Sequence, residues 1–278
     1  MLWPSTRRPR RLDAEVEKRL ALVRQNNHAS ETWLALIEAG LQEAADVARW
    51  HVVVPTVRAD RAARTPLLQG AEMTVDRRAS RRFVEHLADL AALEGPDRQR
   101  LDPIALLEAA ICQDDSRIDS PALRVVAQVA TLPLLVTAAQ QLGREAIPAT
   151  WWEGYCPVCA AWPALAEFRG LERKRWLRCG RCGTAWEIPW LRCPYCGETH
   201  HEQLGYLAPE EGETSRKVEV CHTCNGYLKS EPTVSTLPWW GVLLDDAATV
   251  ALDVAALDRG YHRPERPGFA LTARVVAR

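Results

Sequence analysis

Apolar residues recur every three or four positions through most of the first half of the chain, which is the spacing of helices that bury one face. One such stretch contains Leu34, Ile37, Leu41, Ala44 and Ala48. Two others contain Leu12, Val16, Leu20 and Val23, and Phe83, Leu87 and Leu90. Residues 1–150 are therefore predicted to form a helical domain.

Short polar and proline-containing motifs mark the ends of several of these helices. Asp102-Pro103 and Ser120-Pro121 each combine a capping side chain with proline at the first helical position. Gly95-Pro96 is expected to close the helix that contains Phe83, and Gly143 to end the helix that Ser120 begins.

The most apolar stretch, residues 121–142, is long enough to cross a bilayer, but it contains Arg124, several glutamines and a central Pro133. A buried helix or a pair of short helices is the better interpretation, so no membrane anchor is expected. The basic residues at 5–11 precede charged residues instead of the apolar run of an export signal. They predict a basic tail and a cytoplasmic protein.

The character of the chain changes near residue 150. Six of the eleven tryptophans lie between 151 and 231, among closely spaced Cys, Gly and Pro residues. Residues 232–278 then form a short tail with one predicted helix, which Asp245 or Asp246 would cap and Gly260 would end.

Eight cysteines in the middle region form four CxxC pairs, separated by 19, 10 and 24 residues. The pairs are Cys156/Cys159, Cys179/Cys182, Cys193/Cys196 and Cys221/Cys224. Two CxxC turns placed face to face form a tetrahedral cage of four sulfurs, and the longer intervals suit hairpins within a ribbon. The first two pairs are therefore predicted to form one metal ribbon, residues 151–190, and the last two a second, residues 191–231.

Other arrangements of these cysteines are weaker. A cross-braced pairing, first with third or fourth, is compatible with the spacing. Disulfides need an oxidising compartment, which a cytoplasmic protein does not have. A thioredoxin-like site needs a single CxxC in a βαβ unit, not four in succession. Catalytic zinc keeps an open ligand position, whereas two cages of four sulfurs use every paired cysteine. Zinc and a single iron ion both suit four thiolates. The nearby His200, His201 and His222 are surplus to two closed cages and are expected to be solvated.

The charge balance disfavours a nucleic-acid binder, because such proteins carry an excess of positive charge. The chain has 35 Lys and Arg against 36 Asp and Glu, a net charge of −1. A basic run between Arg169 and Arg178 is expected to be a solvated hairpin face. The arginines beside the sulfurs, Arg178, Arg181 and Arg192, could offset the negative charge of the cages.

The four CxxC pairs are followed by further motifs: Tyr227-Leu228-Lys229, Leu244-Asp245-Asp246, Ala251-Leu252-Asp253 and Gly260-Tyr261-His262-Arg263. Together with Cys-Ala-Ala-Trp-Pro163 after the first pair, they resemble the formate dehydrogenase accessory protein (FdhE) family. The likeness covers residues 150–268 specifically. One departure is the segment 230–242, which has a single acidic residue, Glu231, where family members often have several.

The resemblance implies a cytoplasmic assembly factor, not an enzyme, that binds the catalytic subunit of a respiratory formate dehydrogenase before export. It also implies rubredoxin-like iron sites, with the eight paired cysteines as metal ligands. No catalytic or other cofactor-binding residue is predicted. Two alternatives remain: a zinc-ribbon nucleic-acid-binding protein and a rubredoxin-like iron redox protein. Tryptophans are the candidate partner contacts: Trp151, Trp152, Trp239 and Trp240.

Overall fold

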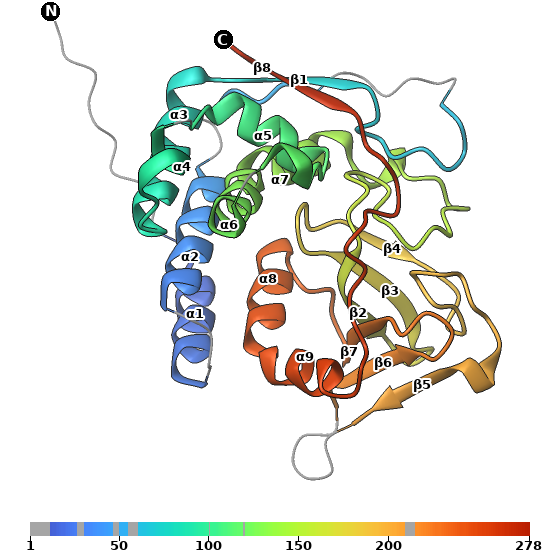
Figure 1. Ribbon diagram of the computed structural model, residues 1–278. Helices are drawn as coiled ribbons and strands as arrows, with labels where there is room; N and C mark the ends of the chain where they lie inside the picture. The colour runs from blue at the N-terminus through green and yellow to red at the C-terminus, as the bar shows by residue number, and fades with distance from the viewer. Residues whose placement is uncertain are drawn as a thin grey trace, which may run out of the picture.

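The computed structural model describes residues 12–26, 31–46, 50–54, 61–99, 101–118, 120–208 and 215–278. In Figure 1, a group of helices lies above and beside a twisted sheet, and the C-terminal segment runs back from the sheet to the helices. The basic tail predicted at residues 5–11 and the helical position of Ala48 lie outside the described residues. The predicted fold class, a helical part followed by two four-cysteine ribbons and a short helical tail, is confirmed.

Seven α-helices are described in the first half of the chain. They are α1 (Ala14–Asn26), α2 (Glu31–Ala45), α3 (Arg77–Leu90), α4 (Gly95–Gln99), α5 (Pro103–Ile111), α6 (Pro121–Ala130) and α7 (Leu132–Leu142). The described apolar positions that predict α1, α2 and α3 are buried, apart from the half-buried Leu90. Their three- and four-residue spacing therefore does identify the buried faces of these helices.

The predicted helix ends at Asp102 and Ser120 are confirmed, whereas the one at Gly95-Pro96 is not. The Asp102 carboxylate accepts hydrogen bonds from the backbone N–H groups of Ile104 and Ala105, and the Ser120 hydroxyl accepts one from Leu123. The prediction for Gly95-Pro96 is wrong: α3 has already ended at Leu90, and this dipeptide begins the short helix α4. Proline at the second position of a helix fits because its missing N–H would have no intrahelical partner there.

The apolar stretch Pro121–Leu142 is a pair of short helices, α6 and α7, as predicted. Pro133 lies in the first turn of α7, and Gly143 ends α7 with a positive φ of 72°. Among the described helical segments, this stretch is the one long and apolar enough to cross a membrane, and 67% of its most apolar window is buried inside the protein. It therefore forms part of the protein core.

The helical region also contains a strand that the apolar pattern does not predict. Strand β1 (Ala71–Val75) pairs in parallel with β8 (Ala273–Ala277), so that Met73 lies opposite Val275. The prediction of an all-helical region up to residue 150 is wrong at this point. Strand β8 also packs against α5. The C-terminal segment is therefore part of the helical region.

Six strands form one mixed sheet in the order β4-β3-β2-β7-β6-β5. The strands are β2 (Pro163–Arg169), β3 (Lys174–Cys179), β4 (Ala185–Glu187), β5 (Leu204–Leu207), β6 (Lys217–Cys221) and β7 (Tyr227–Thr233). Each ribbon contributes three consecutive antiparallel strands, and the two triplets meet where β2 pairs in parallel with β7. The ribbons are thus two similar halves of a continuous sheet.

The tail holds two helices, α8 (Trp239–Ala248) and α9 (Val250–Leu257), where the sequence predicts one. Asp245 and Asp246 lie within α8 instead of capping it, because the helix begins after Pro238 at the two tryptophans. Helix α8 packs against α1 and β2, and α9 packs against β6 and β7. The two helices therefore cover one face of the six-stranded sheet (Figure 1).

Candidate metal centres

The same backbone turn is built four times in the cysteine region. The residue after the second cysteine of each pair has a positive φ: Ala160 (62°), Gly183 (76°), Gly197 (78°) and Asn225 (54°). Only two of these are glycines, and alanine in this conformation is uncommon. In each turn the N–H of the first cysteine donates to the carbonyl five residues later, at 2.8–2.9 Å. The four turns thus present their cysteines in the same way.

The first cluster, which we call site one, consists of Cys156, Cys159, Cys179 and Cys182. Its sulfur atoms lie within 4.8 Å of one another, and the Cys156–Cys182 and Cys159–Cys179 distances are 3.5 Å. None of the four residues is more than 2% exposed, and all four belong to the main hydrophobic core, which also contains residues of α3, α5 and α7. Site one is therefore enclosed between the helical region and the sheet.

The second cluster, site two, consists of Cys193, Cys196, Cys221 and Cys224. Its sulfurs also lie within 4.8 Å of one another, with 3.7 Å between Cys193 and Cys224 and between Cys196 and Cys221. Unlike site one, it contains an exposed cysteine, Cys196, and a half-buried one, Cys224. Site two therefore faces the solvent.

The donor set of each cluster fits one metal ion. Burial raises the pKa of the Cys156 and Cys182 thiols well above the ordinary value, and that of Cys224 to about 12. Four thiolates cannot be packed together without a cation, and a bound metal ion supplies the positive charge that keeps them deprotonated. Zinc and iron both accept four sulfur ligands in a tetrahedron. The two clusters could hold two metal ions per chain.

Backbone N–H groups supply further positive charge to the sulfurs. Those of Arg181 and Cys182 donate to the Cys179 sulfur, and that of Val158 to the Cys156 sulfur, each at 3.4 Å. These bonds follow from the turn geometry, which directs successive N–H groups toward the first cysteine of a pair. They stabilise thiolate over thiol.

The structure places the cysteines together in the order that their intervals predict, first pair with second and third with fourth. The cross-braced alternative does not occur. The histidines are outside both clusters: His200, His201 and His222 are exposed. The His222 ring instead makes a hydrogen bond of 3.1 Å with the Tyr261 hydroxyl.

The expectation of a solvated basic face between Arg169 and Arg178 is wrong. Arg175 and Arg178 are buried and form ion pairs with Glu219 and Glu167. Arg175 and Arg178 are three residues apart in β3, so they lie on opposite faces of the sheet, and each meets a buried carboxylate there. Arg173 and Lys174 at the hairpin stay exposed.

The prediction that arginine side chains offset the charge of the sulfurs is also not supported for Arg178 and Arg181. The Arg181 guanidinium donates to the Ala110 carbonyl of α5, at 2.6 Å, and Arg178 is paired with Glu167. These two side chains join parts of the protein to each other, whereas backbone N–H groups donate to the sulfurs.

The motif residues of β7 and the tail converge on one partly buried ion network. The Lys229 ammonium lies 2.7 Å from carboxylate oxygens of both Asp246 and Asp253, and Arg263 lies 2.9 and 3.0 Å from the same two groups. The Tyr227 hydroxyl donates to Asp253 at 2.9 Å. Burial alone would raise the pKa of Asp246, but the two cations lower it below its ordinary value. The network fastens α8 and α9 to the sheet.

The candidate tryptophans differ in exposure. Trp151 is buried, and Trp239 and Trp240 pack partly against the cluster formed by α1, α2 and α8. Trp152 is 57% exposed. Trp190 is 55% exposed beside the sheet, but it is not among the predicted contacts, because nothing in its local sequence separates it from a core tryptophan.

The difference in burial between the two sites predicts different rates of metal loss. With zinc in both sites, excess chelator under native conditions is expected to remove one metal ion per chain quickly and the second only as the protein unfolds. Native mass spectrometry during chelation measures this. A Cys196→Ser variant should lack the fast phase and keep the slow one, and simultaneous loss of both ions would contradict the prediction.

Comparisons with known proteins agree with the sequence motifs. Residues 191–268 match the protein family described as "FdhE, C-terminal domain". Relatives named "Protein FdhE homolog" occur in Aquifex aeolicus (29% identity over 140 residues), Rhizobium meliloti (34% over 115) and Stutzerimonas stutzeri (37% over 111). These alignments cover 48%, 40% and 39% of this chain, and 47%, 37% and 35% of the relatives. The chain thus matches less than half the length of each.

The crystal structure of the FdhE protein from Pseudomonas aeruginosa shares the fold. Its TM-score against this chain is 0.61, with 22% identity over 93% of this chain and 95% of that one. The structural likeness extends through the helical half, which the sequence motifs do not reach.

Proposed function

We propose that the chain, whose residues 191–268 match the FdhE C-terminal domain, belongs to the FdhE family and is an accessory protein for the production of active formate dehydrogenase. In this role it binds the catalytic subunit of that enzyme and releases it after maturation. It acts as a binding partner, not as an enzyme. The cytoplasm is its proposed location, since the subunit would be bound there before export.

The observation that carries this proposal is the closure of both cysteine clusters. Each has four sulfurs within 4.8 Å of one another, so all eight paired cysteines are used as ligands when two metal ions bind. A catalytic metal centre keeps a position for water or substrate, whereas closed sites serve structure. The proposed role of the metals is therefore to shape a binding surface.

The exposure of site two supports a second candidate, a redox function with iron in that site. A ferric ion held by four thiolates takes up one electron to become ferrous, and electron transfer requires a site near the surface. Cys196 is exposed, so site two meets this condition, while site one does not. Visible absorbance of protein prepared without oxygen, together with metal analysis, separates iron from zinc.

Nucleic-acid binding has less support than the accessory role or the redox function. The arginines that would contact phosphate are used internally, since Arg175 and Arg178 are buried in ion pairs. Binding to nucleic acid depends on exposed cations.

The proposed accessory role is tested by capturing a formate dehydrogenase catalytic subunit with this protein and measuring the activity of the enzyme that matures in cells. The wild-type protein is expected to capture the subunit, and Cys196→Ser to reduce both capture and activity. A Cys112→Ser variant, which changes the cysteine outside the two clusters, is the matched control. Failure of the wild-type protein to capture the subunit, or full activity after loss of the site-two metal, would contradict the proposal.

A further inference from the structure

The outer part of the six-stranded sheet carries exposed aromatic side chains on the face opposite to α8 and α9. Val218 on β6 packs against α9, so its neighbours Lys217 and Glu219 point to the other face, and Tyr206 lies opposite Glu219 in the register. Trp190 lies over this face: its indole N–H donates to the Tyr206 hydroxyl at 3.2 Å. Its ring makes an edge contact with Phe168, with 5.8 Å between ring centroids.

These aromatics form part of the lining of an open hollow of about 420 Å³. We call it the aromatic hollow; it is lined by Phe168, Arg173, Trp190, Tyr206, Lys217 and Pro232, among others. Trp190 and Tyr206 are 55% and 49% exposed, although aromatic rings gain by burial. Exposed, hydrogen-bonded aromatic side chains around a concave surface are typical of protein interfaces.

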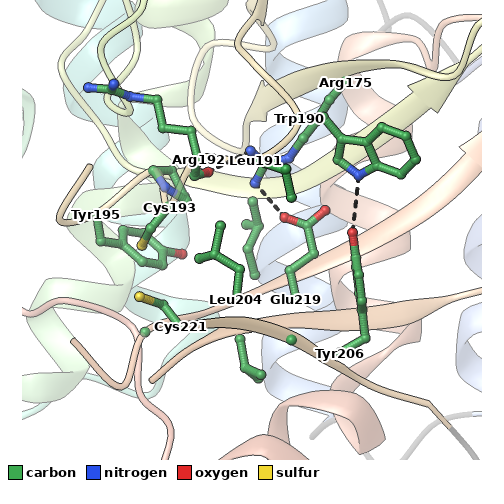
Figure 2. Close-up of a pocket in the computed structure, with 15 residues that line it drawn as sticks. Arg175, Trp190, Leu191, Arg192, Cys193, Tyr195, Leu204, Tyr206, Glu219 and Cys221 are labelled. Carbon is green, nitrogen blue, oxygen red and sulfur yellow. Dashed lines mark hydrogen bonds and ion pairs between the residues drawn. The ribbon is translucent and has the colours of Figure 1, made fainter. Parts of the chain in front are cut away.

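A smaller pocket of about 50 Å³ adjoins the aromatic hollow and shares Trp190 and Tyr206 with it. Figure 2 shows the two rings side by side at one end of this pocket and the site-two residues Cys193 and Cys221 at the other, with Leu204 between them. Its lining is mainly apolar, so it suits an apolar side chain. Because site two forms one wall, the pocket depends on the metal of that site.

The aromatic hollow has a net positive charge, because the carboxylates in its lining are paired with arginines of the protein. Of the carboxylates that line the hollow and the pocket, Glu219 is paired with Arg175, and Glu231 lies 3.1 Å from Arg216. Arg173 and Lys217 are exposed, and neither forms an ion pair with a carboxylate in the described part of the chain. The Lys217 ammonium lies 5.7 Å from the centroid of the Tyr206 ring. An acidic ligand would complement this surface.

The position of β5 indicates the conformation of the ligand. Strand β5, which carries Tyr206, ends the sheet, and its outer edge has no strand partner among the described residues. An edge strand with unpaired backbone groups can accept an added extended segment.

We propose that the aromatic hollow and the adjoining pocket bind an extended polypeptide segment in which an apolar side chain is flanked by aspartates or glutamates. The apolar side chain enters the pocket beside site two, and the acidic groups contact Arg173 and Lys217. The identity of the partner protein rests on the proposed accessory function, whereas binding of such a segment does not.

The first experiment uses three labelled probes in fluorescence anisotropy titrations with the metal-loaded protein. They are a short peptide with leucine between acidic residues, the same peptide with lysines in place of the acids, and an oligothymidylate. The acidic peptide is expected to bind at least about tenfold more tightly than the other two. Equal binding of the lysine peptide, or tighter binding of the oligothymidylate, would overturn the proposal and indicate a nonspecific or nucleic-acid-binding surface.

Surface variants then locate the binding. Trp190→Ala is expected to weaken binding of the acidic peptide at least about tenfold, as for interface anchors, and Lys217→Glu about fivefold. Leu257→Ala and Lys18→Glu, which remove an exposed apolar and an exposed basic side chain elsewhere, should leave the affinity unchanged. Metal content of two ions per chain verifies that each variant is folded. Unchanged affinity of a folded Trp190→Ala variant would refute the assignment.

A final measurement separates this inference from the proposed function. The wild-type protein and Trp190→Ala are compared for capture of a formate dehydrogenase catalytic subunit. Capture by both proteins would leave the accessory role intact and refute this surface as the subunit-binding site. Capture by neither, with the acidic peptide still bound only by the wild type, would refute the accessory role and retain the peptide site.

Discussion

A Cys159→Ser variant is expected to lose the metal ion of site one and, with it, the cooperative folding of the whole protein. Cys159 is fully buried in the main core, and residues of its turn are bonded to the helical region. The N–H groups of Leu67 and Leu68 donate to the carbonyls of Pro157 and Val158, at 2.7 and 3.1 Å. Loss of the turn therefore breaks contacts between the two halves of the molecule.

The expected size of this effect follows from the energies involved. Binding of a structural zinc ion contributes about 10–16 kcal/mol in small zinc domains, which is comparable with the total stability of a typical protein, about 5–15 kcal/mol. Serine is a poor substitute because its hydroxyl is a hard ligand and is left buried. Thermal unfolding followed by circular dichroism, with metal analysis per chain, tests the prediction.

The matched control is Cys196→Ser, the same chemical change in site two. Because Cys196 is exposed and site two lies outside the main core, the helical part should unfold at nearly the wild-type temperature with one metal ion still bound. Equal destabilisation by the two substitutions, or two metal ions in Cys159→Ser, would disprove the difference between the sites.

The second large effect is expected for Glu167→Gln. The Glu167 side chain is completely buried, forms ion pairs with Arg178 and, at 2.5 Å, with Arg169, and accepts a hydrogen bond from the Leu237 N–H at 3.2 Å. Glutamine preserves the shape but leaves buried arginine charge without a counter-ion. Breaking a buried pair in this way typically costs about 3–5 kcal/mol.

Denaturant unfolding measures this loss of stability. The control is Glu172→Gln, since Glu172 forms an exposed ion pair with Lys174 at 3.2 Å. Exposed pairs of this kind contribute about 0–1 kcal/mol, so the control should be close to wild type. A similar, small change in both variants would show that Arg178 and Arg169 find other partners.

Local sequence patterns predict those parts of the structure that depend on neighbouring residues. The caps at Asp102 and Ser120, the buried faces of α1 to α3 and the pairing of the CxxC motifs all arise from spacing within a short segment. The positive φ of the residue after each CxxC pair also belongs to this local turn. At Ala160 and Asn225 the residue type does not indicate a positive φ, as a glycine would.

Features that join distant segments are not visible in the same way. The parallel pairing of β2 with β7 fuses the ribbons, and β1 finds its partner in β8, but neither strand pair leaves a mark on the local pattern. The basic run containing Arg175 was expected to be solvated, because its buried partner, Glu219, lies in the other ribbon. Charged residues that pair across such distances look like surface residues in sequence alone.

The motifs behind the family resemblance have a physical explanation in the tail network. Lys229, Asp246, Asp253 and Arg263 come from four separate motifs and form one set of ion pairs. Their shared role is to hold α8 and α9 on the sheet. The segment at 230–242, which departs from the family pattern, lies outside this set of ion pairs.

The pairing of β1 with β8 has a consequence for the order of events during translation. A ribosome must synthesise residues 76–272 before β8 emerges, so β1 waits for its partner through nearly the whole elongation of the chain. Closing so large a loop is slow and entropically costly. Until then β1 exposes an unsatisfied edge, and the nascent helical half cannot reach its final form. The cysteine turns, whose contacts are more local, have time to capture their metal ions first.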